Sequence, residues 1–137
     1  MDIEHLHQWD ILARSCIDGR FIKRTVDWLT TETGGVFDFR TGIGSSKAII
    51  KSEEDRESFF EVIKTAVKLH GIKEVWLIDH IDCGAYGRSE RFHHNEKHEM
   101  KFHGEKLAEA AAIVQKRFPK LVVRKMYVDW DKVQEME

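Results

Sequence analysis

The chain has no apolar run long enough to span a membrane, little net charge and only two cysteines among its 137 residues. Without such a run, no transmembrane helix is predicted. A formal net charge of −2, with basic and acidic residues interleaved, gives no positive field that would attract nucleic acid. Two cysteines are too few for the disulfide framework of a small secreted protein, so a metal site or a reactive thiol becomes the better interpretation.

The remaining composition is ordinary for a soluble globular protein. Hydrophobic residues make up 42% of the chain and charged residues 34%, with a single proline. The length is near the common domain size, so we expect one domain over residues 1–137. The first residues, MDIEHLHQWD, lack the basic region and apolar core of a signal peptide, so we expect a cytoplasmic protein.

Apolar runs and turn signals alternate along the chain in a regular order. Strands are predicted for WDILARSC, VFDFR, EVWLID and LVVRKMYV. Glycine stops, an N-cap signal and helical periodicity predict helices over residues 20–35, 52–71 and 107–118. The alternation predicts an α/β fold of three layers, in which a mainly parallel sheet of about four strands has helices on both faces.

Both cysteines lie in polar turns that directly follow predicted strands. Cys16 lies in SCIDGRF, and Cys83 lies in DHIDCGAYG, three residues after His80. Ligands of open parallel sheets bind beyond the carboxyl ends of the strands, so both turns are expected to face a site. A turn lets His80 and Cys83 point at one ion, and Cys16 can be a third ligand if the two strands are neighbours. Two thiolates and one imidazole favour Zn²⁺ over magnesium or calcium.

Asp18 and Arg20, directly after Cys16, decide what such a zinc site can do. Three protein ligands leave one tetrahedral position open. Asp18 either binds the metal and closes the site, or pairs with Arg20 and leaves that position to water. In the second case zinc lowers the pKa of the water towards roughly 7. Asp18 would then accept a hydrogen bond from the water, while Arg20 keeps Asp18 ionised.

The segments CIDGR and HIDCG resemble the paired Cys-x-Asp-x-Arg and His-x-x-Cys-Gly motifs of the β-class carbonic anhydrases. The two motifs have the same order and a similar separation, and the similarity extends from about Ile11 to Gly87. The resemblance implies the fold of that family and zinc-dependent hydration of carbon dioxide to bicarbonate, together with assembly into a homodimer or a higher homo-oligomer. It also implies metal ligands and catalytic residues: Cys16, His80 and Cys83 on Zn²⁺, with Asp18 and Arg20 in catalysis.

Two other functions stay open. The segment RTGIGSS stands where the family usually has an Asn-Ala-Gly-Asn loop on the substrate side, so hydrolysis of carbonyl sulfide or carbon disulfide is a second hypothesis. A third is a non-catalytic binding or regulatory domain stabilised by zinc, with Asp18 as a permanent fourth ligand. Gly42 and Gly44 do not indicate a phosphate cradle, because the lysine of a P-loop is missing and Lys47 does not replace it.

Each candidate residue also has an ordinary structural interpretation. A cysteine such as Cys16 or Cys83 is often a buried free thiol, and a lone histidine such as His80 is often a hydrogen-bonded core residue. Asp18 and Arg20 alone would be a surface ion pair of little energetic value. The pairing of the two motifs favours the metal-binding interpretation.

The remaining polar residues near the second cysteine turn are given weaker roles. Asp82 is expected to face solvent or to bond within its loop. Four histidines are expected to belong to a solvated polar segment: His93, His94, His98 and His103. Since histidine titrates near neutrality, a proton shuttle is the alternative for this segment.

Overall fold

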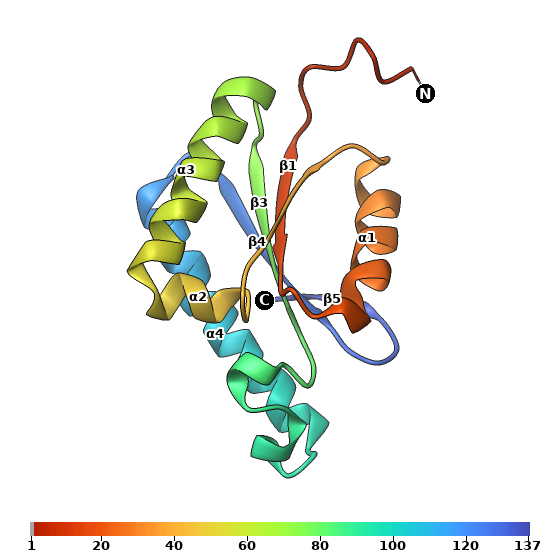
Figure 1. Ribbon diagram of the computed structural model, residues 1–137, viewed down its shortest axis with the longest axis vertical. Coiled ribbons are helices and arrows are strands. Elements are labelled where there is room, and N and C mark those ends of the chain that lie inside the picture. The colour runs from red at the N-terminus through yellow and green to blue at the C-terminus, as the bar shows by residue number, and fades with distance from the viewer. Residues whose placement is uncertain (1) are drawn as a thin grey trace.

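The computed structural model describes residues 2–137 and shows an α/β fold (Figure 1). The elements in chain order are β1 (Ile11–Ser15), α1 (Gly19–Thr33), β2 (Asp38–Thr41), α2 (Ser46–Lys51), α3 (Glu53–His70), β3 (Glu74–His80), η1 (Gly84–Tyr86), η2 (Ser89–Phe92), α4 (Glu96–Arg117), β4 (Val122–Val128) and β5 (Val133–Met136). The strands form one sheet in the order β2-β1-β3-β4-β5. Within the described range, no helix has the length and apolar character needed to cross a bilayer.

The sheet separates two hydrophobic cores. Successive strand side chains point to opposite faces, so Leu12 and Leu77 pack against α2, α3 and α4, whereas Ala13 and Trp76 pack on the side of α1. Figure 1 shows the same arrangement, with α1 on one side of the sheet and the other helices on the opposite side. The predicted fold class is confirmed: a mainly parallel sheet lies between helices on both faces.

Local signals in the sequence explain why α3 has these ends. The Ser52 side chain accepts a hydrogen bond from the backbone N–H of Asp55, and acidic residues occupy the first turn. At the other end Gly71 has a φ of 65°, a left-handed conformation that glycine adopts without steric cost. These are the start and stop that the sequence predicts for this helix.

Three elements differ from the sequence-based expectation. α4 begins at Glu96, well before the expected start near residue 107, because Asn95 caps it by accepting a hydrogen bond from the backbone N–H of His98. The loop after β2 contains the short helix α2. β5 is an additional strand, which pairs antiparallel with β4 and makes the sheet five strands wide.

The strand register determines where the two cysteine turns lie. β1 pairs directly with β3 in parallel, with Leu12 opposite Val75 and Arg14 opposite Leu77. The carboxyl ends of both strands therefore lie at the same edge of the sheet. The condition for Cys16 to approach the turn after β3, that the two strands are neighbours, is fulfilled.

Candidate metal centre

Three potential metal ligands meet at the carboxyl ends of β1 and β3. Cys16 follows the last residue of β1, His80 ends β3, and Cys83 lies in the turn after it. All three side chains are buried, and one ligand atom from each lies within 4.8 Å of the other two. The structure therefore brings together the three residues that the sequence predicts as metal ligands.

Hydrogen bonding fixes which nitrogen of His80 faces the cysteines. Its Nδ1 lies 2.6 Å from the backbone carbonyl oxygen of Ile81, to which an Nδ1–H donates. The ring also stacks on Phe21 at a centroid distance of 4.5 Å. Nε2 is buried and has no hydrogen-bond partner among the described residues. A buried nitrogen held in this orientation without a partner is what a metal-binding imidazole requires, so the site fits a metal ion.

The two cysteines are free thiols, and their sulfur atoms lie within 4.8 Å of each other. This proximity lowers the pKa of the Cys16 thiol and raises that of Cys83, because the two thiols compete to hold one proton. Backbone N–H groups of Asp18 and Gly44 also donate towards the Cys16 sulfur and favour its thiolate. Thiolates next to an imidazole are a donor set suited to zinc.

The β2–α2 loop is shaped by a buried arginine. Arg14, from β1, donates two hydrogen bonds to the carbonyl oxygen of Ser45, at 3.2 and 3.1 Å. Its guanidinium lies against Gly42, so any side chain at position 42 would collide with it. A larger residue at position 42 would therefore displace a guanidinium that the Ser45 carbonyl holds in place.

Asp18 and Arg20 form a close pair beside the three ligands. Asp18 caps α1 by accepting a hydrogen bond from the backbone N–H of Arg20, and its Oδ2 lies 2.7 Å from Nη2 of Arg20. These hydrogen bonds lower the pKa of the Asp18 carboxyl to about 2. The same Oδ2 is 3.9 Å from Nε2 of His80. An ionised carboxylate, oriented by an arginine, thus borders the free nitrogen of His80.

A second carboxylate, which the sequence did not reveal, also binds Arg20. Asp82 Oδ2 lies 3.0 Å from Nη1 of Arg20, and the Asp82 backbone oxygen accepts from Nη2 at 3.1 Å. The expected bond within the loop is present too, because Asp82 Oδ1 accepts from the backbone N–H of Ser89. The signal for this role was its position in the turn between His80 and Cys83.

The turn that carries Asp82 is held by a buried glutamate on α4. Glu99 is completely buried, and its two oxygens accept hydrogen bonds of 2.7 Å from the Asp82 backbone N–H and the Ser89 hydroxyl. Asp82 has a φ of 57°, a conformation that costs energy for a residue with a side chain. Glu99 satisfies the N–H that this conformation directs inward and so stabilises the turn.

A second buried network lies on the same side, under the end of β3. The carboxylate of Asp79 accepts hydrogen bonds from the Ser46 backbone N–H and hydroxyl, at 3.1 and 2.7 Å, and lies 2.7 Å from Nδ1 of His103. The Ser46 hydroxyl also contacts the Tyr86 hydroxyl at 2.8 Å. The network joins β3, α2, η1 and α4 next to His80.

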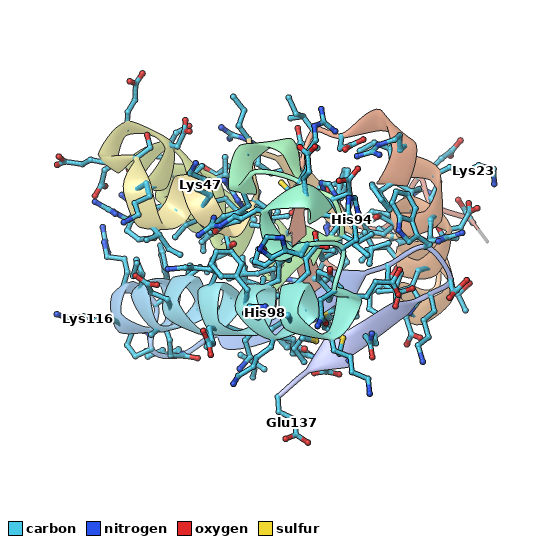
Figure 2. All side chains as sticks on the ribbon, turned by 90° about the horizontal axis from the view of Figure 1, so that it is seen from below. Lys23, Lys47, His94, His98, Lys116 and Glu137 are labelled. Carbon is cyan, nitrogen blue, oxygen red and sulfur yellow. The ribbon has the colours of Figure 1, made fainter. Side chains whose placement is uncertain are left out.

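The four later histidines divide into two groups. His93, His94 and His98 are exposed, as the sequence predicted, and Figure 2 shows His94 and His98 at the end of the molecule where β3 finishes. The same expectation is wrong for His103, which is completely buried because it faces Asp79 from the inner side of α4.

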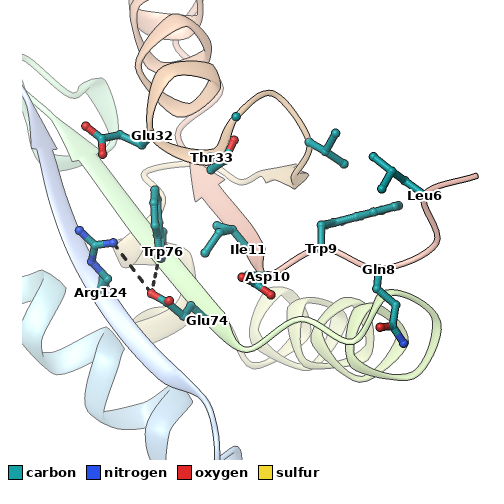
Figure 3. Close-up of a pocket in the computed structure, with 12 residues that line it drawn as sticks. Leu6, Gln8, Trp9, Asp10, Ile11, Glu32, Thr33, Glu74, Trp76 and Arg124 are labelled. Carbon is teal, nitrogen blue, oxygen red and sulfur yellow. Dashed lines mark hydrogen bonds and ion pairs between the residues drawn. The ribbon is translucent and has the colours of Figure 1, made fainter. Parts of the chain in front are cut away.

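Cavities at the two ends of the sheet differ in size. A cavity of about 510 Å³ lies at the amino ends of β1 and β3, bordered by Trp9, Trp76 and Arg124 (Figure 3). Beside Cys16 and His80 there is a hollow of only about 10 Å³. The large cavity is at the opposite end from the candidate ligands, whereas the hollow beside them has room for about one water molecule.

Comparison with known proteins identifies relatives over nearly the whole chain. A family model described as "Putative carbonic anhydrase" matches residues 8–136. A protein of Rickettsia bellii, described as uncharacterized, is 32% identical over 88% of this chain and 77% of its own length. An uncharacterized protein of Rickettsia conorii is 31% identical over 97% of this chain and 74% of its own length. No solved structure matches the chain.

Proposed function

Since the chain belongs to the family described as "Putative carbonic anhydrase", we propose that it hydrates carbon dioxide reversibly to bicarbonate, with Zn²⁺ held by Cys16, His80 and Cys83. One observation favours this proposal over a non-catalytic zinc domain. The unpartnered Nε2 of His80 lies between buried thiols and an oriented carboxylate, with Asp18 Oδ2 at 3.9 Å. A purely structural site would not need a carboxylate fixed at its border.

The chemical requirement is a nucleophilic water at neutral pH, and bound zinc supplies the Lewis acidity that makes water nucleophilic. Asp18 orients that water, because its ionised carboxylate accepts a hydrogen bond from it. Arg20 keeps Asp18 in place through three side-chain hydrogen bonds and keeps its pKa near 2. Asp18 therefore stays an acceptor over the whole physiological pH range.

Arg20 in turn depends on Asp82 for its position. The guanidinium is shared between the two carboxylates, and Glu99 holds the turn that supplies the second one. The result is a chain of contacts from the interior of α4 to the carboxylate at the site. We assign Asp82 and Glu99 as positioning residues.

Carbon dioxide is small, neutral and linear, so it needs no deep binding pocket. The hollow of about 10 Å³ beside Cys16 and His80 is large enough for about one water molecule and is not a binding pocket for the substrate. Carbonyl sulfide or carbon disulfide is a second candidate, because the segment RTGIGSS stands where the family usually has its substrate-side loop.

The test combines metal content with catalysis. Zinc is measured by elemental analysis, and carbon dioxide hydration by stopped flow at mildly alkaline pH, with Cys83→Ala as the metal-free control. One zinc per chain and fast hydration, both lost in Cys83→Ala, support the proposal. Zinc without hydration would contradict it, and sulfide release from carbonyl sulfide would then select the second candidate. Absence of both activities would support a non-catalytic zinc domain.

A further inference from the structure

A basic pocket lies on the outer side of the turn that follows Cys83. Its volume is about 250 Å³, and it is lined by two aromatic residues, one aliphatic residue and four basic ones: Tyr86, Phe102, Ile50, Lys47, Lys51, Arg91 and Lys106. None of these lining residues is acidic, although the chain as a whole has a net charge of −2. The positive charge is therefore concentrated locally by the fold.

The cations converge on the basic pocket from three elements. Lys47 and Lys51 come from α2, Arg91 from η2 and Lys106 from α4. α2 packs directly against α4, which brings their lysines to one opening. Figure 2 shows Lys47 on α2, away from the exposed His94 and His98. Four cations without an acidic residue among the lining groups favour a negatively charged ligand, because opposite charges attract.

The protein itself offers little compensation. Lys106 lies 3.3 Å from Glu109, but this carboxylate is about half exposed, and such surface pairs contribute little. Aromatic faces take up part of the charge: the guanidinium of Arg91 lies 4.5 Å from the ring centroid of Phe102, and Nζ of Lys47 lies 5.8 Å from that of Tyr86. The rings of Tyr86 and Phe102 therefore stabilise these cations but leave their positive charge in place.

Two of the cations are also held by the backbone of η1. Nζ of Lys47 donates to the carbonyl oxygen of Ala85 at 2.6 Å, and Nη1 of Arg91 donates to that of Tyr86 at 3.1 Å. These bonds fix both side chains in the pocket wall. None of the three candidate metal ligands lines the pocket, so it is a separate place from the metal centre.

We propose that the basic pocket binds a small anion with at least two negative charges, of the phosphate or diphosphate class. Four cations exceed what a single bicarbonate ion would need. Guanidinium and ammonium groups together are the usual ligands of phosphate oxygens. The volume is sufficient for two linked phosphate groups. This inference does not depend on carbon dioxide hydration, because binding can be measured with no substrate present.

The experiment is isothermal titration of the zinc-loaded protein with inorganic diphosphate, at about physiological ionic strength, followed by inorganic phosphate and chloride. Two charge reversals, Lys51→Glu on α2 and Lys106→Glu on α4, probe the pocket from two elements, and no hydrogen bond among the described residues joins either residue to η1. Lys116→Glu is the matched control, since Lys116 is exposed in the last turn of α4 and lies outside the pocket.

We expect one diphosphate site per chain, phosphate binding that is weaker, and no saturable response to chloride. Lys51→Glu and Lys106→Glu should each weaken diphosphate binding at least tenfold, whereas Lys116→Glu should change it less than twofold. Unchanged affinity in both pocket variants would place the anion outside the basic pocket and overturn the proposal. An equal loss in Lys116→Glu, or no binding at millimolar diphosphate, would overturn it too.

Discussion

Glu99 and Asp82, from α4 and from the turn after β3, are joined by a hydrogen bond of 2.7 Å from the Asp82 backbone N–H to a completely buried Glu99 oxygen. The other Glu99 oxygen accepts from the Ser89 hydroxyl at the same distance. Asp82 then binds Arg20, and Arg20 binds Asp18. The interior of α4 therefore fixes the carboxylate beside the candidate metal ligands, although Glu99 itself touches none of them.

Replacement Glu99→Gln tests this connection. The amide keeps the shape but offers one acceptor oxygen for two donors, so a buried donor loses its partner. The free energy of unfolding should fall by about 1–3 kcal/mol. Carbon dioxide hydration should fall by about tenfold or more, since misplacing a catalytic group slightly is costly, while zinc content stays unchanged. Denaturant titration, stopped flow and elemental analysis measure the three quantities.

The matched control for that change is Glu105→Gln, an exposed position on the same helix. It should leave the free energy of unfolding and the rate of carbon dioxide hydration as they are in the unmodified protein. If Glu99→Gln were as active as the control, the positioning role of Glu99 would be wrong, even if stability had fallen.

Replacement Asp18→Asn removes the charge of the carboxylate but keeps its size. Because an amide is uncharged and has one acceptor oxygen instead of two, it holds water and Arg20 more weakly, and hydration should fall by about 100-fold or more. Zinc should remain at one per chain, since Asp18 is assigned no place among the ligands. Asp27→Asn, on the exposed surface of the same helix, should be fully active. Loss of zinc from Asp18→Asn would instead identify Asp18 as a fourth ligand.

The low pKa of Asp18 gives a pH dependence of defined sign. Hydrogen bonds from Arg20 lower the pKa to about 2, below the value of about 3.9 expected in an unfolded chain. The stabilisation is therefore complete above about pH 4 and is lost as the pH falls towards 2. It should be small, since the Arg20 side chain is 43% exposed. Carbon-detected NMR titration of the Asp18 carboxyl measures the midpoint, and a midpoint near 4 would contradict the pairing.

Removal of the proposed ligand His80 should show how much of the protein's thermal stability depends on bound metal. His80→Ala should lose zinc, and chelator should no longer change its melting temperature, because a metal that binds only the folded state stabilises it. In the unmodified protein chelator should lower the melting temperature. His98→Ala, which changes an exposed histidine, should behave like the unmodified protein. Equal zinc content in the two variants would exclude His80 as a ligand.

The convergence of the three candidate ligands could be predicted because their signal is local. Cys16 follows β1 directly and Cys83 lies three residues beyond the end of β3, and parallel strands place such turns at one edge of the sheet. The sequence signals for the helix ends at Gly34 and Gly71 are also local, since both glycines adopt the left-handed conformation expected after a helix.

Glu99 and His103 could not be predicted because their signal is not local. They lie in the segment EKHEMKFHGEK, whose composition is that of a solvated surface. Both are nevertheless completely buried, since α4 turns them towards the turn after β3 and towards Asp79. A buried polar residue is recognised only through the partner that the fold brings to it. β5 escaped prediction for the same reason, as four residues become a strand only by pairing with β4.

Two Asp–His pairs with the same separation allow burial to be tested in isolation. Asp79 and His103 are 2.7 Å apart with both side chains 1% exposed, whereas Asp38 and His70 are 2.7 Å apart with exposures of 19% and 30%. Water can replace a lost partner only at the second pair. Asp79→Asn should therefore lower the free energy of unfolding by about 3 kcal/mol or more, and Asp38→Asn by about 1 kcal/mol or less.

Asp79→Asn should also disturb contacts beyond His103. The Asp79 carboxylate accepts both hydrogen bonds from Ser46, and the Ser46 hydroxyl contacts Tyr86. An amide at position 79 presents N–H groups to some of these donors and leaves them unpaired within a dry interior. Urea titration of both variants gives the comparison directly. Equal losses of unfolding free energy in the two variants would contradict this prediction. They would mean that hydrogen-bond distance, rather than exclusion of water, determines how much each pair stabilises the protein.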